Sequence, residues 1–210
     1  MTRLLIIGAT GLVGKLALEQ ALADKRVDQV IALTRRPIAP RDKLENVVID
    51  FAEMPAQAPW WSVDGVVCAL GTTRAETKSR TAYRAIDHDY PLAVARHARD
   101  HGATRFALTS SLGADPRSPF VYTRMKGELE LALKTLGFPS LTILRPSVLD
   151  GERAQHRPGE RMTKIIFGML APVLPRRAHI SPASAVAAAL LDGAIEASPG
   201  IHLKTNKDMS

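Results

Sequence analysis

The chain is poor in cysteine, with a single residue, Cys68, in 210 positions. One cysteine excludes an internal disulfide. Cys68 lies inside the apolar run 66–70, so we expect a buried structural thiol rather than a reactive one. Aromatic residues are also few, at 5%. The adjacent Trp60 and Trp61 are expected to cover an edge of the core rather than to bind a substrate.

Long apolar runs, linkers and repeats are absent as well. No run has the length of a membrane-spanning helix, and no cleavable signal precedes the first apolar segment. These two absences predict a cytosolic protein. With 46% hydrophobic residues and no Gly/Ser-rich or charged linker, the chain is expected to form one domain over residues 1–210.

Acidic residues are outnumbered, and the formal net charge is +7. The basic residues are scattered and no nucleic-acid motif accompanies them, so nucleic acid is not the expected partner. A basic surface that serves phosphate-bearing small ligands explains the charge as well. The six histidines lack the spacing of metal ligands, and no metal site is predicted. His88, His97 and His101 are expected on one solvent-facing helix.

A glycine-rich turn near the start of the chain carries the strongest signal. The apolar run 3–7 leads into Gly8, Gly11 and Gly14, and a helix-patterned stretch follows. This spacing lets a strand turn sharply, lets backbone approach a pyrophosphate and lets a helix N-terminus face the anion. A phosphate loop of the ATPase kind is rejected, because Leu16 stands where a magnesium-binding Ser or Thr belongs.

Apolar runs then alternate with helical patterns along most of the chain. Helical patterns are expected at 15–23, 84–101, 121–136 and 183–197. Buried strands are expected at 3–7, 29–34, 46–50, 65–70, 104–110, 141–144 and near His202. The alternation predicts an α/β fold with a doubly wound parallel sheet, a Rossmann fold. Residues 146–182, rich in Pro and Arg, are the expected substrate-side segment.

The residues after the second strand indicate the cofactor. NAD enzymes commonly place an acidic residue there to bind the ribose, whereas this chain has Arg35 and Arg36. Two guanidiniums suit the 2′-phosphate of NADP, so we expect NADPH rather than NADH. The alternative is that both arginines are a solvated loop end before Pro37.

Tyr122 and Lys126 are one helical turn apart after the strand that ends in Ser110 and Ser111. With the glycine turn, this set resembles the short-chain dehydrogenase/reductase superfamily, in its atypical branch. Further motifs resemble the Tat-interacting oxidoreductase-like group. They are Leu70-Gly71-Thr72-Thr73-Arg74, Ser110-Ser111-x-Gly-Ala-Asp115, Tyr122-x-x-x-Lys126-Gly127-Glu128, Arg145-Pro146 and Arg157-Pro158-Gly159-Glu160.

The resemblance implies a catalytic set. Tyr122 would be the acid/base, Lys126 would tune it and bind the nicotinamide ribose, and Ser111 would hold the substrate oxygen, with Ser110 as the alternative. One departure concerns Asp87, which stands where many members carry an asparagine that supports a water next to the lysine. Asp87 could accept bonds from such a water, or it could cap or pair locally with Arg84, and the residues leave both possibilities open.

The expected cofactor site collects residues that follow the strands. Asp50 and Phe51 are placed to touch the adenine edge, Gly71 would let backbone pass close to the cofactor, and Arg145 would line the nicotinamide pocket. The whole set is Gly8, Thr10, Gly11, Leu12, Val13, Gly14, Arg35, Arg36, Asp50, Phe51, Leu70, Gly71, Thr72, Tyr122, Lys126 and Arg145.

Two functions of different classes remain at this point. The first is an NADPH-dependent oxidoreductase, or a related lyase or epimerase, acting on a small carbonyl or hydroxyl compound. The second is an NADPH-binding regulator that acts through a protein partner. A homodimer is equally open, and the polar residues 155–157 hint at a polar or anionic substrate.

Overall fold

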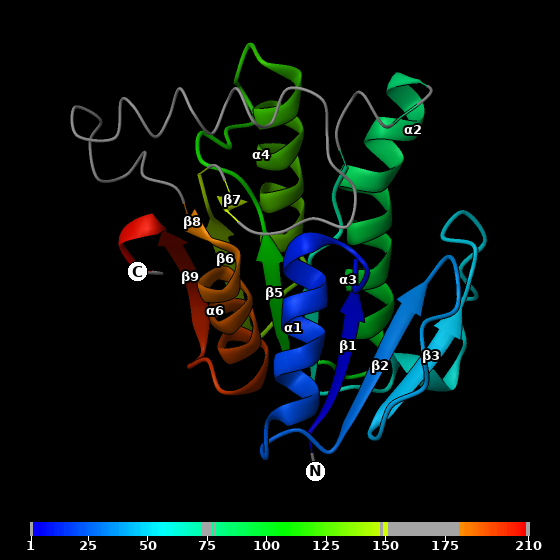
Figure 1. The fold of residues 1–210 in the computed structure, drawn as a ribbon. Helices are drawn as coiled ribbons and strands as arrows, with labels where there is room; N and C mark the ends of the chain where they lie inside the picture. Colours follow the sequence, from blue (N-terminus) through cyan, green and yellow to red (C-terminus); the bar gives the residue numbers. More distant parts are fainter. Residues whose placement is uncertain (1, 73–76, 78, 148, 151–180, 209–210) are drawn as a thin grey trace.

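A parallel sheet of seven strands forms the centre of the protein in a computed structural model (Figure 1). The structure describes residues 2–72, 77, 79–147, 149–150 and 181–208. The strand order is β3-β2-β1-β4-β5-β6-β9, and every pairing is parallel. The strands are β1 (Arg3–Ile7), β2 (Gln29–Thr34), β3 (Leu44–Val48), β4 (Gly65–Cys68), β5 (Arg105–Thr109), β6 (Ser140–Arg145) and β9 (Gly200–Thr205). The predicted doubly wound parallel sheet is confirmed.

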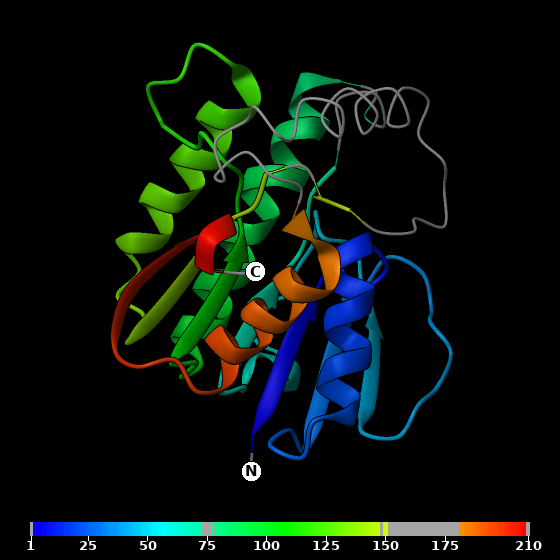
Figure 2. The ribbon, with the colours of Figure 1, turned by 60° about the vertical axis from the view of Figure 1, so that its left-hand side comes forward.

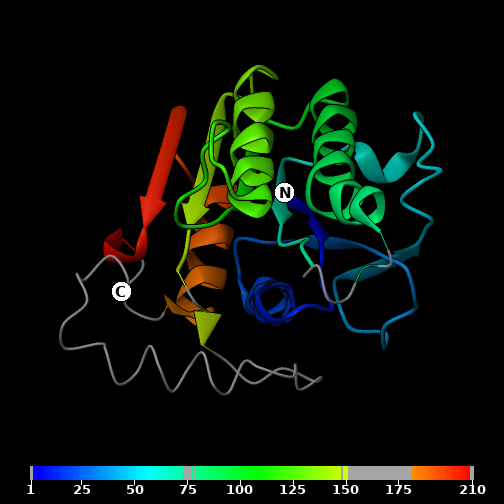
Figure 3. The same ribbon diagram turned by 90° about the horizontal axis from the view of Figure 1, so that it is seen from above.

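Helices cover both faces of the sheet, as the view from above shows (Figure 3). On one face lie α1 (Leu12–Ala23) and α6 (Ala183–Ile195), which pack on alternate strand residues such as Leu4 and Ile6. On the other lie α3 (Tyr90–Asp100) and α4 (Val121–Lys134), which pack on the intervening residues such as Leu5 and Ile7. Because both faces are buried, the central strands are apolar throughout instead of alternating.

Short elements complete the described part. They are the 3-10 turns η1 (Pro59–Trp61) and η5 (Asn206–Asp208), the helix α2 (Arg80–Arg84), the π-helical turn η3 (Ala85–Asp89), and a two-stranded sheet of β7 (Leu149–Asp150) and β8 (Ser181–Pro182). The turned view shows this small sheet above α6, at the end of the molecule to which the β1–β6 arrows point (Figure 2).

The order of strands places a switch point at β1. The chain runs outward from β1 to β2 and β3, then returns to add β4 on the other side of β1. In such sheets ligands bind beyond the carboxyl ends of the strands at the switch point. The residues that follow β1 and β4 are therefore the first place to look for a site.

Several predicted boundaries are wrong by a few residues. The strand expected at 46–50 is β3 at Leu44–Val48, the strand expected at 65–70 ends at Cys68, and the first helix begins at Leu12 instead of Lys15. Helix α1 starts early because Gly11 is its N-cap and the turn runs directly into the helix. The strand expected near His202 and the last helix are confirmed.

The helix expected at 84–101 differs in a way that concerns the site. It is a composite of α2, η3 and α3, and Ser79 caps it by accepting a hydrogen bond from the amide of Ala82. The wide turn η3 adds a residue to the helical period, so Asp87 and His88 both point inward. His88 is only 7% exposed, and the expectation of a solvent-facing His88 is wrong.

Trp61 is fully enclosed, with its ring stacked 4.9 Å from that of His97, whereas Trp60 is partly exposed. Cys68 is buried, as expected. Of the expected substrate-side segment 146–182, only residues 146–147, 149–150, 181 and 182 lie among those described, and the motif 157–160 and the polar residues 155–157 lie outside them.

Candidate functional site

The glycine turn joins β1 to α1 with no space for side chains at two positions. Gly8 has a φ of +83°, and a Cβ there would lie 2.5 Å from the carbonyl carbon of Ala69. A Cβ on Gly14 would lie 2.0 Å from the carbonyl oxygen of Gly8. Glycine is therefore required at both places for β1, β4 and α1 to meet this closely.

The helix end that this turn presents is open. Thr10 and Gly11 are exposed and Leu12 is partly exposed, while Val13 and Gly14 are buried below them. No side chain caps α1, and its first turn has no acidic residue that would repel an anion. The uncapped amides and the close backbone approach fit a dinucleotide pyrophosphate.

Arg35 and Arg36 follow β2 and are both exposed. Neither guanidinium makes an ion pair with any residue that the structure describes. The loop itself is ordered by Thr34, whose hydroxyl donates to the carbonyl of Arg36 at 2.8 Å and accepts from Asn46 at 2.8 Å. Two unneutralised cations thus stand on a fixed loop at the carboxyl end of β2.

The two residues expected at the adenine edge differ in exposure. Asp50 is exposed, and its Oδ1 accepts a hydrogen bond from the amide of Ala52 at 2.9 Å. Phe51 is 6% exposed, and its ring lies 5.7 Å from that of Tyr90. The side chain of Phe51 therefore belongs to the core.

The segment after β4 packs directly on a buried ion pair. A Cβ on Gly71 would lie 3.4 Å from Asp87 Oδ1 and 3.8 Å from Lys126 Nζ. Next to it, the amide of Thr72 donates to Asp87 Oδ2 at 2.9 Å, and Leu70 packs against the core. Gly71 leaves open the space over this pair that any side chain would fill.

The ion pair itself joins η3 to α4. Lys126 Nζ lies 3.1 Å from Asp87 Oδ1, and the two side chains are 3% and 1% exposed. Asp87 Oδ1 receives no directed hydrogen bond from the described residues, so the lysine is its charge partner. Of the two roles left open for Asp87, local pairing with Arg84 is wrong, because Arg84 instead pairs with Glu128 at 2.7 Å.

The surroundings of Lys126 keep its side chain positively charged. Burial lowers its pKa, but the neighbouring Tyr122 and Asp87 outweigh that effect, so the pKa of Lys126 is raised. Its Nζ lies 5.9 Å from the centre of the Tyr122 ring, and Tyr122 is 39% exposed. A fixed ammonium therefore lies beside a phenol that solvent and ligands can reach.

The two serines after β5 have different surroundings. Ser110 is buried, and its hydroxyl donates to Glu130 Oε1 at 2.5 Å. Ser111 is partly exposed, and its hydroxyl makes one long bond, of 3.2 Å, to the carbonyl of Leu112. The hydroxyl of Ser111 is the freer of the two.

Glu130 was not singled out from the sequence, although it lies one turn beyond Lys126 on the same face of α4. It is 2% exposed and binds Arg145 through both oxygens, at 2.9 and 2.6 Å. Hydrogen bonding to Glu130 raises the pKa of Arg145. The four-residue spacing of Tyr122, Lys126 and Glu130 was the available signal.

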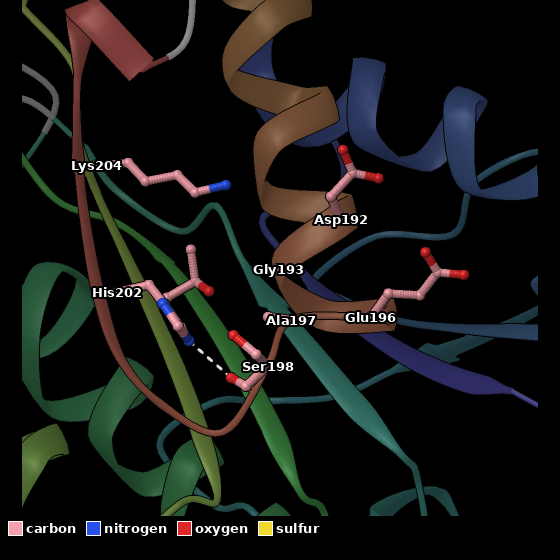
Figure 4. A pocket seen from close by; sticks show the side chains of 8 residues that line it. Asp192, Gly193, Glu196, Ala197, Ser198, His202 and Lys204 are labelled. Carbon is pink, nitrogen blue, oxygen red and sulfur yellow. Dashed lines mark hydrogen bonds between the residues drawn. The ribbon is translucent and has the colours of Figure 1, made fainter.

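One hollow at the surface lies apart from the predicted site residues. A recess of about 210 Å³ opens between the C-terminal half of α6 and β9, lined by Asp192, Glu196, His202 and Lys204 among others (Figure 4). Within the described ranges, no cluster of metal-ligating side chains occurs. Helices long and apolar enough to span a bilayer are likewise absent from that part of the chain.

The turn, the parallel sheet and the lysine-bearing helix together define an NAD(P)H-binding Rossmann protein. The chain belongs to the NAD(P)H-binding family, whose model matches residues 8–165. It is 38% identical over 183 residues to a protein named fmp52, mitochondrial, of Emericella nidulans, covering 82% of this chain and 78% of that one. It is 34% identical over 208 residues to rat HTATIP2, covering 96% and 85% of the two chains. The resemblance to the Tat-interacting group is confirmed.

Solved structures show the same fold. MoeE5, in complex with UDP-glucuronic acid and NAD, matches with a TM-score of 0.74 at 18% identity, over 96% of this chain and 75% of that one. The Bordetella bronchiseptica enzyme WbmH, in complex with NAD⁺, matches with a TM-score of 0.69 at 17% identity, over 98% and 75%. These likenesses confirm the short-chain dehydrogenase/reductase-like fold.

One expectation is overturned by the relatives. The sequence predicted a cytosolic protein, but the fungal relatives are named as mitochondrial proteins. The prediction rested on the absence of a membrane span and of a secretory signal, and neither absence distinguishes the cytosol from the mitochondrion.

Proposed function

We propose that this protein is an NADPH-dependent oxidoreductase that acts on a small carbonyl or hydroxyl compound. The observation that carries the proposal is the arrangement on α4, where the buried ammonium of Lys126 lies 5.9 Å from the ring of the accessible Tyr122. Gly71 brings the backbone after β4 to within reach of that ammonium. The dinucleotide turn at Gly8 packs on the same segment.

Each residue has a defined task in this proposal. NADPH, when bound, supplies a hydride. The phenol of Tyr122 gives a proton to the carbonyl oxygen of the substrate, and the hydroxyl of Ser111 holds that oxygen. Lys126 favours the phenolate left after the proton has gone, because a nearby cation stabilises the charged form. Proton and hydride together convert the carbonyl into an alcohol.

The choice of NADPH rests on Arg35 and Arg36. Both guanidiniums are exposed without an ion-pair partner in the described part, and a 2′-phosphate would give them one. One charge-assisted contact is worth about 1.5–3 kcal/mol, which corresponds to a preference of about 10- to 150-fold over NADH. Asp50, which is exposed after β3, is assigned to the adenine edge and not to the 2′-phosphate.

The first test is a fluorescence titration of the protein with NADPH and with NADH. We expect tighter binding of NADPH, and we expect Arg35→Ala to reduce that preference by about tenfold or more. Arg41→Ala is the matched control, since Arg41 is exposed but already paired with Glu19 at 3.0 Å. An unchanged ratio in Arg35→Ala would overturn the assignment of the cofactor.

The second test separates binding from chemistry. In a screen of carbonyl substrates with NADPH, Tyr122→Phe is expected to lose turnover while keeping the dissociation constant for NADPH within about threefold. Equal turnover in the variant would exclude Tyr122 as the acid/base.

A further inference from the structure

A second hollow lies between α2 and α4, and its lining does not include Tyr122, Lys126 or Glu130. Its volume is about 220 Å³, and its lining consists of Arg80, Tyr83, Arg84, Val121, Arg124, Met125 and Glu128. The deep residues are Tyr83 and Met125, at 7% and 4% exposure, and they offer mainly ring and thioether surface. At the mouth, Val121 is 43% exposed. The hollow is therefore an apolar cavity with a charged rim.

The rim carries an excess of positive charge. Arg84 is neutralised, since it pairs with Glu128 at 2.7 Å and with Asp89 at 3.6 Å. Among the described residues, Arg124 donates to carbonyls of the preceding loop, including that of Ser118 at 2.9 Å, and pairs with no carboxylate, so it keeps its full charge. Arg80 is exposed and has no ion-pair partner in the described part of the chain.

The size of the cavity limits what can fill it. Sites for drug-sized ligands are commonly about 300–1,000 Å³, and this one is smaller. It matches a single large apolar side chain, the kind of anchor that dominates protein interfaces. Phe120, which precedes the cavity in the chain, is 73% exposed and extends the apolar surface beside it.

We propose that this cavity, termed here the α2/α4 cavity, is a docking site for an acidic segment of a partner protein that inserts one aromatic or large aliphatic side chain between α2 and α4. Carboxylates on either side of the anchor pair with Arg80 and Arg124. Charge complementarity argues for this occupant, because Arg80 and Arg124 have no carboxylate partner in the described part of the chain, and a segment bearing carboxylates would supply one to each.

The residues that line this cavity are not among those proposed for the cofactor and the reaction, so the proposal stands whether or not the protein has oxidoreductase activity. The test uses protein labelled with ¹³C at the methionine methyl groups, in which the Met125 methyl reports from inside the cavity. Three capped peptides serve as probes: Asp-Glu-Phe-Glu-Asp, the same peptide with Ser replacing Phe, and Lys-Lys-Phe-Lys-Lys.

We expect only the acidic Phe peptide to shift the Met125 methyl resonance in a saturable manner. Arg80→Glu and Arg124→Glu should each weaken its binding about tenfold, which corresponds to about 1.4 kcal/mol. Arg96→Glu is the matched control, because Arg96 is an exposed arginine on α3 with no ion-pair partner in the described part. It makes the same change in net charge away from the cavity.

Four results would overturn the proposal. They are no saturable shift at millimolar peptide, equal binding of the Ser peptide, an equal loss in Arg96→Glu, and a dimer in sedimentation analysis that Val121→Glu dissociates. The last would assign the surface to a second copy of the chain. A titration of each variant with NADPH, read separately, keeps a failure of this proposal distinct from a failure of the cofactor assignment.

Discussion

The ammonium of Lys126 and the carboxylate of Asp87 face each other at 3.1 Å with almost no solvent access. They join α4 to the π-helical turn at the carboxyl edge of the sheet, under Gly71. Charges in the low-dielectric interior need a partner of opposite sign, because an isolated buried charge has a large unfavourable desolvation free energy. The pair therefore holds α4 against η3, and its lysine provides a fixed positive charge beside Tyr122.

Removing one member of this ion pair is expected to destabilise the folded protein. Asp87→Ala should lower the free energy of unfolding in urea by about 3–5 kcal/mol, because Lys126 is left buried without its counter-charge. Asp89→Ala, at a side chain that is 51% exposed, should cost less than about 1 kcal/mol. If the double variant Asp87→Leu/Lys126→Met is no more stable than Asp87→Ala, charge imbalance is not the cause.

A buried and a more exposed ion pair on α4, made by Glu130 and Glu128, can be compared in stability. Glu130→Gln removes the charge that binds Arg145 through two oxygens, and we expect a loss of about 1.5–3 kcal/mol. Glu128→Gln breaks a pair with Arg84 that is nearer to solvent, and should cost less than about 1 kcal/mol. Denaturant curves of the two variants, measured side by side, test this order, and equal losses would contradict it.

The glycine turn predicts a separation of folding from binding. Gly14→Ala should destabilise the protein severely, because the new methyl group would meet the Gly8 carbonyl oxygen at 2.0 Å. At Gly11 the corresponding distance is 3.3 Å and the surface is open, so Gly11→Ala should fold with a loss of less than about 1 kcal/mol.

The same Gly11→Ala variant is expected to weaken NADPH binding about tenfold or more, because its methyl group stands where a phosphate would approach the helix amides. Thermal unfolding and the NADPH titration measure the two effects on one sample. Wild-type affinity in Gly11→Ala would place the pyrophosphate elsewhere.

Cys68 supplies a test that depends on pH. Burial raises the pKa of its thiol to about 11. At pH 8.5 only about one thiol in 300 is then ionised, and we expect iodoacetamide to leave the native protein unmodified and to label it in guanidinium. Stoichiometric labelling of the native protein would contradict the burial.

The sign of the linked stability change follows from the direction of this shift. A folded-state pKa above that of the unfolded thiol means that the stability due to Cys68 is fully present below about pH 9 and is lost as the pH rises toward 11. Between pH 9 and pH 10.5 the unfolding free energy should therefore fall less in Cys68→Ala than in the wild type. The difference amounts to about 1.5 kcal/mol.

Most of the fold could be predicted from local sequence. The apolar runs near Leu5 and Ile31 predicted buried parallel strands because strands covered on both faces need no polar side, and the sheet confirms them. The spacing of Gly8, Gly11 and Gly14 predicted a dinucleotide turn for a backbone reason that needs no tertiary information. The sequence did not predict which side chains of the helical segment 84–101 are buried. The π-helical turn η3 places His88 in the interior, whereas a regular helix was expected to expose it.

The sequence by itself determined the class of fold, the glycine turn and the one-turn spacing of Tyr122 and Lys126, since each follows from local backbone geometry and side-chain periodicity. Only the tertiary structure decided that Asp87 pairs with Lys126 instead of Arg84, and that Glu130 holds Ser110 and Arg145. Such pairs join elements 15 to 39 positions apart in the chain. The distances within these pairs depend on how the helices pack on the sheet, and local sequence patterns do not predict that packing.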